Sequence, residues 1–388
     1  MKIYFIHSYY QYRGGEDNVF EQEIELLKDN HNVMSVSFYN KKGIVGALQF
    51  FFSLWNISVY KRVKSDFLKF KPDVVHIHNW HYASGPIIIQ AAKKRGIPVV
   101  VTIHNYRLLC PSGSLMNDGK VFLDSTYVRF PWSAVFRKVF RNSYLMTFWL
   151  GFIVWFHKKI GTWNLVDRYI VLTDFVKHLY VSSSLGIDSF KYSVKPNFVN
   201  RFQPKDVERQ SHYLYIGRLS KEKGAEIMLS AFQGSKHRIR IAGEGTLTDM
   251  VRESSKKFVN IEYLGVLDRE DIRREIQECT ALLFPSIWYE PFGMVLIEAF
   301  ALGCPVIASN IGSPTELVKD GRDGMHFEAG NCKALSDTLD KWASLPEDEK
   351  QAYGNRARST YEQYYTPEVN YEMLMNIYQS VLGQKSVR

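Results

Sequence analysis

The sequence predicts an α/β protein made of two doubly wound parallel-sheet domains in succession. Apolar runs such as VVVTI (99–103) and YIVL (169–172) are continuous, as in strands buried on both faces of a parallel sheet. Helical stretches separate these runs and supply the crossovers that parallel strands require. With 388 residues, 46% of them apolar and 23% charged, the chain has the size and balance for two globular domains.

The first domain begins with the strand KIYFIHS, a Gly-rich turn and a helix whose apolar positions Val19, Phe20, Ile24 and Leu27 recur with the period of 3.6. Strands and helices then alternate. The further expected strands are 31–39, 72–79, 97–105 and 166–173, and the further expected helical regions are 44–70, 85–96 and 174–186.

A second series of strands starts near residue 212. Its expected members are HYLYIG, RIRIAG, NIEYLG, ALLFPS, PVIAS and GMHF. We place the first domain at 1–196 and the second at 197–366, because the stretch 194–210 between them holds two prolines and many polar residues. The tail from 367 to 388 is expected to begin as an amphipathic helix.

Ligands of doubly wound sheets bind outside the carboxyl ends of the strands, so the loops there are candidate sites. In the first domain, Gly14 and Gly15 of RGGED follow the first strand and let a ligand approach the backbone and the helix N-terminus. A glycine pair of this kind is equally compatible with a plain turn.

Histidines mark two other strand ends of the first domain. His104 follows VVVTI, where a side chain reaches the expected crevice, although a lone histidine is more often structural. His76, His78 and His81 surround the strand end HIHNWH. No carboxylate accompanies them at a useful sequence spacing, so we expect no metal.

In the second domain, YIGRLSKEKG follows the first strand. Arg218 and Lys223 lie on either side of a loop that leads into a helix, and two cations at such a place suit a diphosphate. The alternative is a solvated basic turn.

The segment EPFGMVLIE places Glu290 in a loop after a strand and Glu298 about a turn into the next helix. Each carboxylate can accept hydrogen bonds from a pair of vicinal hydroxyls, one pair on a sugar and the other on a ribose. Phe292, Gly293, Met294 and Val295 would offer backbone N–H groups to phosphate at the helix start.

These motifs in order resemble the retaining glycosyltransferases of family 4, which have the GT-B fold. The residues that carry the resemblance are Gly14–Gly15, His104, Arg218 with Lys223, the GEG of 243–245, and the two glutamates 290 and 298. It extends from residue 1 to about 380. RGGED with HNYRLLCPSG further resembles the branch that builds bacterial surface polysaccharides.

The resemblance implies two Rossmann-like domains facing a central crevice, with the C-terminal helix crossing back to the first domain. It also implies roles. Gly15, beside Gly14, would donate its N–H to the donor diphosphate, and Arg218 and Lys223 would neutralise the leaving phosphates. Glu298 would bind the ribose and Glu290 the donor sugar, next to His104.

Other residues of the second domain would complete the nucleotide site by the same resemblance. They are Gly243 and Glu244 of the GEG, and Gly265 and Val266 of the YLGVL loop (263–267) that would pack against the base. The expected catalytic set is His104, Glu290, Arg218 and Lys223. No Asp-x-Asp pair occurs, so we expect a reaction without metal or cofactor, in which a leaving phosphate oxygen takes the acceptor's proton on the front face.

The net charge of +9 is unevenly spread. Residues 30–65 and 125–166 contain no Asp or Glu, but they are basic and rich in Phe, Trp and Leu. Such segments suit an anionic membrane surface, and we expect a cytoplasmic protein that sits peripherally on the inner face of the membrane. A plain helix core is the alternative. Nucleic acid is disfavoured because no nucleic-acid motif accompanies the charge.

The predicted function is transfer of a sugar from a nucleotide-sugar, by family habit a UDP-sugar, to a lipid-linked or saccharide acceptor. The alternatives are a glycosyl phosphate synthase or phosphorylase on the same fold, and a non-catalytic sugar-nucleotide-binding subunit. A sugar epimerase would not need the two spaced glutamates. A dehydrogenase is disfavoured because no GxGxxG follows the first strand.

Overall fold

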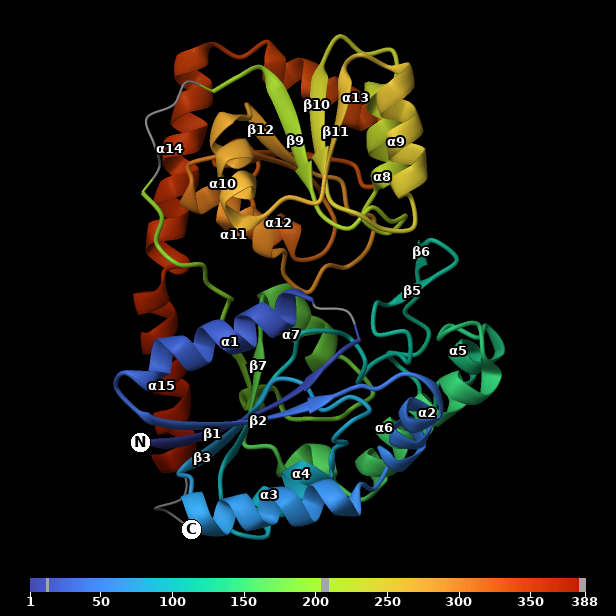
Figure 1. The fold of residues 1–388 in the computed structure, drawn as a ribbon, viewed down its shortest axis with the longest axis vertical. Coiled ribbons are helices and arrows are strands. Elements are labelled where there is room, and N and C mark those ends of the chain that lie inside the picture. The colour runs from blue at the N-terminus through green and yellow to red at the C-terminus, as the bar shows by residue number, and fades with distance from the viewer. Residues whose placement is uncertain (12–13, 204–208, 384–388) are drawn as a thin grey trace. The chain divides into compact units, whose positions relative to one another are not determined.

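The chain forms two compact units in the computed structural model (Figure 1), which describes residues 1–11, 14–203 and 209–383. The first unit comprises Met1–Asn117, Phe122–Pro196 and Asn370–Arg388, and the second comprises Asp118–Val121 and Asn197–Val369. Three parts of the sequence-based predictions lie outside the described residues: Arg13 of the RGG turn, residues 204–208 of the boundary stretch, and residues 384–388 of the tail.

The first unit is built on a six-stranded sheet of order β2-β1-β3-β4-β7-β8, in which every adjacent pair is parallel. The strands are β1 (Lys2–Tyr9), β2 (Asn32–Tyr39), β3 (Val74–Ile77), β4 (Val99–Thr102), β7 (Arg168–Val171) and β8 (Tyr192–Val194). The numbering reverses between β1 and β3, which makes that pair the topological switch point of a doubly wound sheet.

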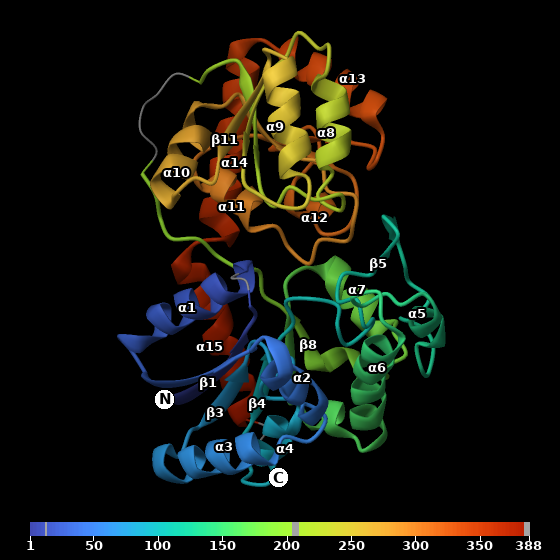
Figure 2. The ribbon, with the colours of Figure 1, turned by 45° about the vertical axis from the view of Figure 1, so that its right-hand side comes forward.

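Helices cover both faces of this sheet (Figure 2). The helices of this unit are α1 (Gly15–Lys28), α2 (Gly43–Phe52), α3 (Ile57–Phe70), α4 (Ile87–Lys93), α5 (Trp132–Phe136), α6 (Tyr144–Lys159), α7 (Asp174–Val181) and α15 (Pro367–Gly383), of which α5 packs on α6. Ile3 and Phe5 of β1 pack in one core with α1 and α15. Tyr4 lies between them in the strand and faces the other side of the sheet, where its ring meets Phe67 of α3 edge-on at 5.0 Å between centroids. Strand β1 is thus buried on both faces, which explains its continuous apolar run.

The C-terminal helix α15 therefore belongs to the unit that contains the first strand. Its residues Leu374, Met375, Ile377, Tyr378 and Val381 enter the core with β1, β3, β4 and β7. The expectation that the last helix returns to the first domain is confirmed.

The second unit is built on a sheet of order β11-β10-β9-β12-β13-β14, again with parallel pairs, and its switch point lies between β9 and β12. Its strands are β9 (His212–Ile216), β10 (Arg238–Ala242), β11 (Ile261–Gly265), β12 (Ala281–Phe284), β13 (Val306–Ser309) and β14 (Gly324–Phe327). All six strands predicted for this domain are present.

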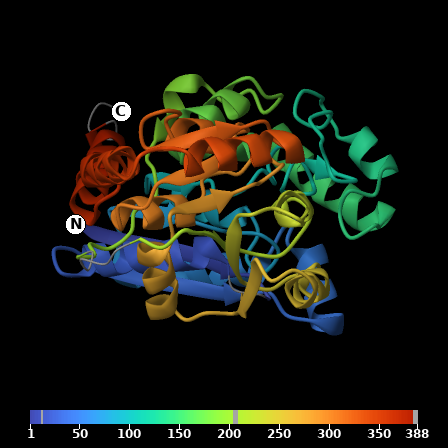
Figure 3. The ribbon, with the colours of Figure 1, turned by 90° about the horizontal axis from the view of Figure 1, so that it is seen from above.

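Two layers of helices enclose the second sheet (Figure 3). The helices are α8 (Ala225–Phe232), α9 (Thr248–Lys257), α10 (Arg269–Glu278), α11 (Met294–Ala301), α12 (Pro314–Leu317), α13 (Cys332–Ala343) and α14 (Glu347–Tyr364). Helices α8, α9 and α13 share one core with the sheet, whereas α11 packs between β12 and α14.

Three features of the chain before residue 197 differ from the sequence-based expectation. The helical region 44–70 is two helices. Helix α2 ends at Phe52, and the Asn56 side chain caps the start of α3 by accepting from the Val59 N–H at 3.1 Å. Strand β8 and the hairpin β5 (Met116–Asn117) and β6 (Lys120–Val121) were not predicted, since two or three residues give no periodicity.

Among the described residues, no single helix has the length and hydropathy to cross a bilayer. Helices α2 and α3 pass such a test only together, and the pair is bent by 73°.

Candidate functional site

Glu290 is the best-anchored of the predicted site residues. It follows β12 at the switch point of the second sheet, and its side chain is buried. One oxygen, Oε1, accepts from Lys223 Nζ at 2.5 Å, Trp288 Nε1 at 2.8 Å and Ser286 Oγ at 2.9 Å. Three donors on one oxygen fix the orientation of the carboxylate before any ligand arrives.

The structure pairs Lys223 with Glu290 instead of with Arg218. The Arg218 side chain is 62% exposed, and its guanidinium lies 2.7 Å from the carboxylate of Glu222, four residues further along the same loop. The Lys223 ammonium also lies over the Trp288 ring, 5.5 Å from its centroid. The two predicted phosphate ligands are therefore on one loop but do not form a single cationic pair.

The loops that follow β9, β10 and β11 are tied together through their backbones. Gly217 N–H donates to Ala242 O at 3.1 Å, and Gly243 N–H donates to Gly265 O at 2.7 Å. A Cβ on Gly243, whose φ is +127°, would lie 2.0 Å from Gly217 O. The first glycine of the predicted GEG is thus required for close packing of these loops, while Glu244 and Val266 beside it are exposed.

Helix α11 carries the second predicted glutamate. It starts after Gly293, whose φ is +121°, and Phe292 before it is buried against Tyr365, with ring centroids 6.2 Å apart. Met294 and Val295 open the helix and are half-buried. Glu298 is half-buried as well, and burial raises the pKa of its carboxyl although Arg269 and Arg273 oppose the shift.

In the first unit, Gly14 and Gly15 lie where predicted, at the start of α1. A Cβ on Gly14 would meet no described atom within 4 Å, so packing does not require this glycine. The turn is held by Asp17, whose carboxylate accepts from Gly14 N–H at 2.8 Å and bonds to the buried His7 at 2.6 Å.

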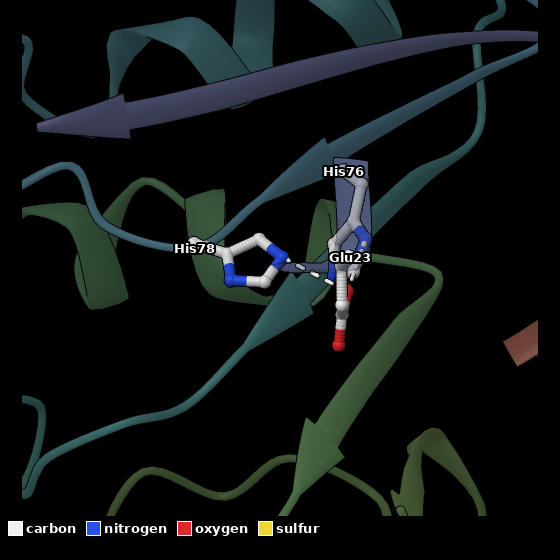
Figure 4. A group of neighbouring side chains, drawn as sticks. All are labelled: Glu23, His76 and His78. Carbon is white, nitrogen blue, oxygen red and sulfur yellow. Dashed lines mark ion pairs between the residues drawn. The ribbon is translucent and has the colours of Figure 1, made fainter. Parts of the chain in front are cut away.

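His104 follows β4 and is half-buried. Its Nε2 shares a hydrogen bond with Nδ1 of His78 at 3.1 Å, and the two rings are stacked. Nε2 of His78 lies 3.2 Å from Glu23 Oε2 (Figure 4, which also draws His76), and the other oxygen of Glu23 binds Lys195 Nζ at 2.7 Å. A buried chain of polar groups thus runs from His104 to a fully buried lysine.

The pKa values in this chain follow from burial and from the lysine. Burial lowers the pKa of His76 and of His104 well below the usual value, so both rings are neutral at pH 7. Burial by itself would raise the pKa of Glu23, but Lys195 and His78 more than offset it and hold it well below the usual range.

Glu23, His76 and His78 place one possible metal ligand each within 4.8 Å of one another. No carboxylate lies near the histidines in sequence, as expected, but Glu23 of α1, more than fifty residues earlier in the chain, is brought beside them by the fold. His76, however, uses Nδ1 for Tyr378 OH and Nε2 for Thr102 Oγ1, both at 2.7 Å, and Glu23 holds the Lys195 ammonium. Both His76 nitrogens are thus engaged by protein, whereas Glu23 Oε2 and His78 Nε2 lie 3.2 Å apart without another partner among the described residues. A metal at this place would have to displace a hydrogen bond of His76.

Comparison with known proteins bears on the family and the fold. Residues 30–201 match the family "Glycosyltransferase Family 4", and residues 197–360 match the family "Glycosyl transferases group 1". The structure of Anabaena Alr3699/HepE in complex with UDP superposes with a TM-score of 0.70 at 16% identity, covering 98% of this chain and all of that one. Sucrose-phosphate synthase from Thermosynechococcus elongatus gives 0.71 at 15% identity and 99% coverage of both.

Two relatives known from sequence match part of the chain. An uncharacterized 42.6 kDa protein of the cps region of Klebsiella pneumoniae is 27% identical over 269 residues, which are 68% of this chain and 64% of that protein. O-antigen chain mannosyltransferase C of Escherichia coli is 28% identical over 179 residues, 45% of this chain and 48% of that one. The matched parts thus span less than two thirds of either relative.

The two doubly wound units and the fold likeness define a protein of the GT-B class. Within that class, the chain belongs to the glycosyltransferases of family 4.

Proposed function

We propose that the chain transfers a sugar, with retention of configuration, from a nucleotide-sugar to a lipid-linked or saccharide acceptor in surface polysaccharide synthesis. The observation that carries the proposal is the Lys223–Glu290 pair, which is fixed at the switch point of the second sheet beside the N-terminus of α11. UDP is the favoured nucleotide, because the Anabaena neighbour is described with UDP and with UDP-glucose.

In this proposal, Glu290, Lys223 and Arg218 act on different parts of the donor. Glu290 accepts hydrogen bonds from donor-sugar hydroxyls, and Lys223, which touches it, also faces the leaving diphosphate. Arg218 turns from Glu222 to the phosphates, a change open to an exposed side chain. Two cations stabilise the charge that develops on the leaving group, and no metal is required for that step.

The acceptor's proton passes to a leaving phosphate oxygen on the front face. His104 stands beside the donor sugar as a neutral ring, since its pKa is lowered by burial. The buried chain behind it, through His78 to Glu23, selects one orientation of that ring.

We further propose that the first unit rests on an anionic membrane. Helix α2 exposes Ile44 (81%) and Phe52 (63%), and the α5–α6 region exposes Trp132 and Phe136. The inner sides of the two regions meet where Trp149 Nε1 donates to Phe50 O at 3.0 Å. The stretches that were expected to be either core or membrane-facing are therefore buried on one side and exposed on the other.

Nucleotide release tests the enzymatic proposal. The purified chain is incubated in EDTA with a panel of UDP- and GDP-sugars, with and without a bacterial lipid extract. Release from one donor that the lipid stimulates is the expected result. Absence of release with retained UDP binding in a calorimeter would favour a non-catalytic subunit, and absence of both would overturn the roles of Glu290 and Glu298.

Charge reversal tests the membrane proposal. Changing Arg137, Lys138 and Arg141 together to Glu is expected to move the protein from vesicles containing anionic lipid into the soluble fraction. The matched control reverses three exposed basic residues of α9 in the second unit, Arg252, Lys256 and Lys257. Equal partition of the two triple variants would contradict a role for the α5–α6 region.

A further inference from the structure

Five side chains that the proposed function does not use gather at the switch point of the first sheet. Glu16 stands in the first turn of α1, Tyr10 follows β1, Asn79 follows β3, and Asn105 and Arg107 follow β4. Since ligands of doubly wound sheets bind at this point, the cluster occupies the place where a ligand of the first unit is expected.

Two amides hold the Glu16 carboxyl from opposite sides. Asn79 Nδ2 donates to Glu16 Oε1 at 3.0 Å, and its own oxygen accepts from the His81 N–H. Asn105 Nδ2 lies 3.5 Å from Glu16 Oε2 and from Tyr10 OH, and its oxygen accepts from the Arg107 N–H. Because each amide oxygen is bound to backbone, each NH₂ group must face the carboxyl, which is therefore preorganised.

The Glu16 side chain is half-buried, and each carboxylate oxygen has one amide contact and a second lone pair that can accept a further hydrogen bond. Burial, together with the neighbouring Asp17, raises its pKa to about 7, although Asn105, Arg107 and Asn79 oppose the shift. A fixed acceptor of this kind suits the hydroxyl groups of a saccharide, as does Glu290 in the second unit.

Arg107 interacts electrostatically with this carboxyl, and one of its N–H groups has no partner among the described residues. Its guanidinium is 5.3 Å from the centroids of both Tyr82 and Phe140. Nη1 donates to Pro111 O, whereas Nε is buried and has no partner among the described residues. A buried guanidinium with an unused N–H is a binding group for a phosphate oxygen.

A path of aromatic rings continues from the cluster toward the exposed helices. Tyr10 meets Tyr82 at 6.3 Å, Tyr82 meets Phe50 of α2 at 5.5 Å, and Phe50 packs with α6. The outer faces of these helices are the apolar, acid-free surface described above. Within one unit, a hydroxyl acceptor, a cation, aromatic rings and an apolar surface thus follow one another.

We infer that this series is the binding site of an acceptor in which a saccharide is joined through phosphate to a hydrocarbon chain. The saccharide hydroxyls bind Glu16, the phosphate binds Arg107, and the hydrocarbon chain leaves along Tyr82 and Phe50 toward α2 and α6. The inference rests on the proposed function. Of the two acceptor classes proposed there, lipid-linked and free saccharide, it selects the lipid-linked class.

Acceptor kinetics with two matched probes test the site. The first set of probes is undecyl diphosphate-linked hexoses and N-acetylhexosamines, and the second is the octyl glycosides of the same sugars, which lack phosphate. Glu16→Gln is expected to raise the acceptor KM at least tenfold for both sets and to leave the donor KM unchanged. Arg107→Gln is expected to raise the acceptor KM tenfold for the diphosphate-linked probes only.

The control is Glu25→Gln, since Glu25 lies exposed on the same helix and is expected to change neither KM. An unchanged acceptor KM in Glu16→Gln, or an equal effect of Arg107→Gln on both probes, would overturn the inference. Glu16→Asp and Arg107→Lys replace any variant that does not fold. Failure of the proposed function is distinguishable, because the unmodified chain would then release no nucleotide with any probe.

Discussion

The carboxyl edges of the two sheets hold their candidate site residues in different ways. In the second unit, Glu290 is fixed by Ser286 and Trp288, which are four and two residues away, and by one lysine from the neighbouring loop. In the first unit, His104 is backed by Glu23 of α1 through His78, and by Lys195, which follows β8. One site is built within its loops, and the other depends on segments from the whole unit.

Because of this difference, we expect substitutions in the two units to change different properties of the protein. A change in the loops of the second unit should alter binding and catalysis while the unit stays folded. A change in the buried chain of the first unit should alter stability first, because removing one partner leaves an unpaired charge inside the protein.

Lys195→Met gives the largest expected effect. It leaves the Glu23 carboxylate buried without its cation and should lower the free energy of unfolding by about 3 to 5 kcal/mol. Urea unfolding combined with hydrogen exchange of the β1 and β4 amides measures the loss in the first unit.

Two further variants sharpen that measurement. Replacing both partners, Lys195→Met with Glu23→Gln, should recover part of the stability. Lys28→Met removes the partner of Glu25 from an exposed pair and should leave the free energy of unfolding nearly unchanged. If Lys195→Met and Lys28→Met lower the free energy of unfolding equally, the stability of the first unit does not depend on its buried chain of polar groups.

Lys223→Ala is expected to have the next largest effect, on catalysis instead of stability. Loss of the ammonium removes both a partner of Glu290 and a stabiliser of the leaving group, so kcat/KM should fall about 100-fold, equal to about 2.7 kcal/mol. Thermal unfolding should change little. Glu290→Gln tests the carboxylate itself, and turnover close to that of the unmodified chain would exclude a role for its charge.

The smallest expected effect concerns pH. The pKa of Glu16 is raised to about 7, so its carboxyl is ionised above this pH and protonated below it. An ionised carboxylate accepts hydroxyl hydrogen bonds better, and kcat/KM for the acceptor should fall about tenfold between pH 8 and 6. The charged groups that face it are Asp17 and Arg107, with Tyr10 and Tyr82 beside them.

Glu16→Gln should flatten this acidic limb without moving the pH dependence of the donor KM. A limb that persists in Glu16→Gln would assign the titration to another group and weaken the contrast between the two edges.

The fold was largely predictable because buried parallel strands have a plain signature. In runs such as VVVTI and ALLF, the residues that face either side of the sheet are mostly apolar, and these runs form strands β4 and β12. The break between α2 and α3 was missed because Ser53 and Asn56 stand in an otherwise helical pattern, and a cap is decided by one side-chain hydrogen bond.

The candidate site was predictable only where its parts are close in sequence. Glu290 lies in a loop between a clear strand and a clear helix, so its position followed from local pattern. Glu23 lies among the polar residues of an amphipathic helix and carries no sign of burial, and Lys195 reads as part of a polar boundary. Their pairing is a product of tertiary packing, which periodicity does not record.

The placement of α15 has a consequence for the order in which the protein is made. The ribosome synthesises β1 long before α15, yet the core around β1, β3 and β4 includes Leu374, Tyr378 and Val381 of α15. Asn370, the second hydrogen-bond partner of Lys195, also comes from this late helix. All segments of the second unit have therefore been synthesised while the first unit still lacks α15. During synthesis, the half that starts the chain is therefore the last to finish folding.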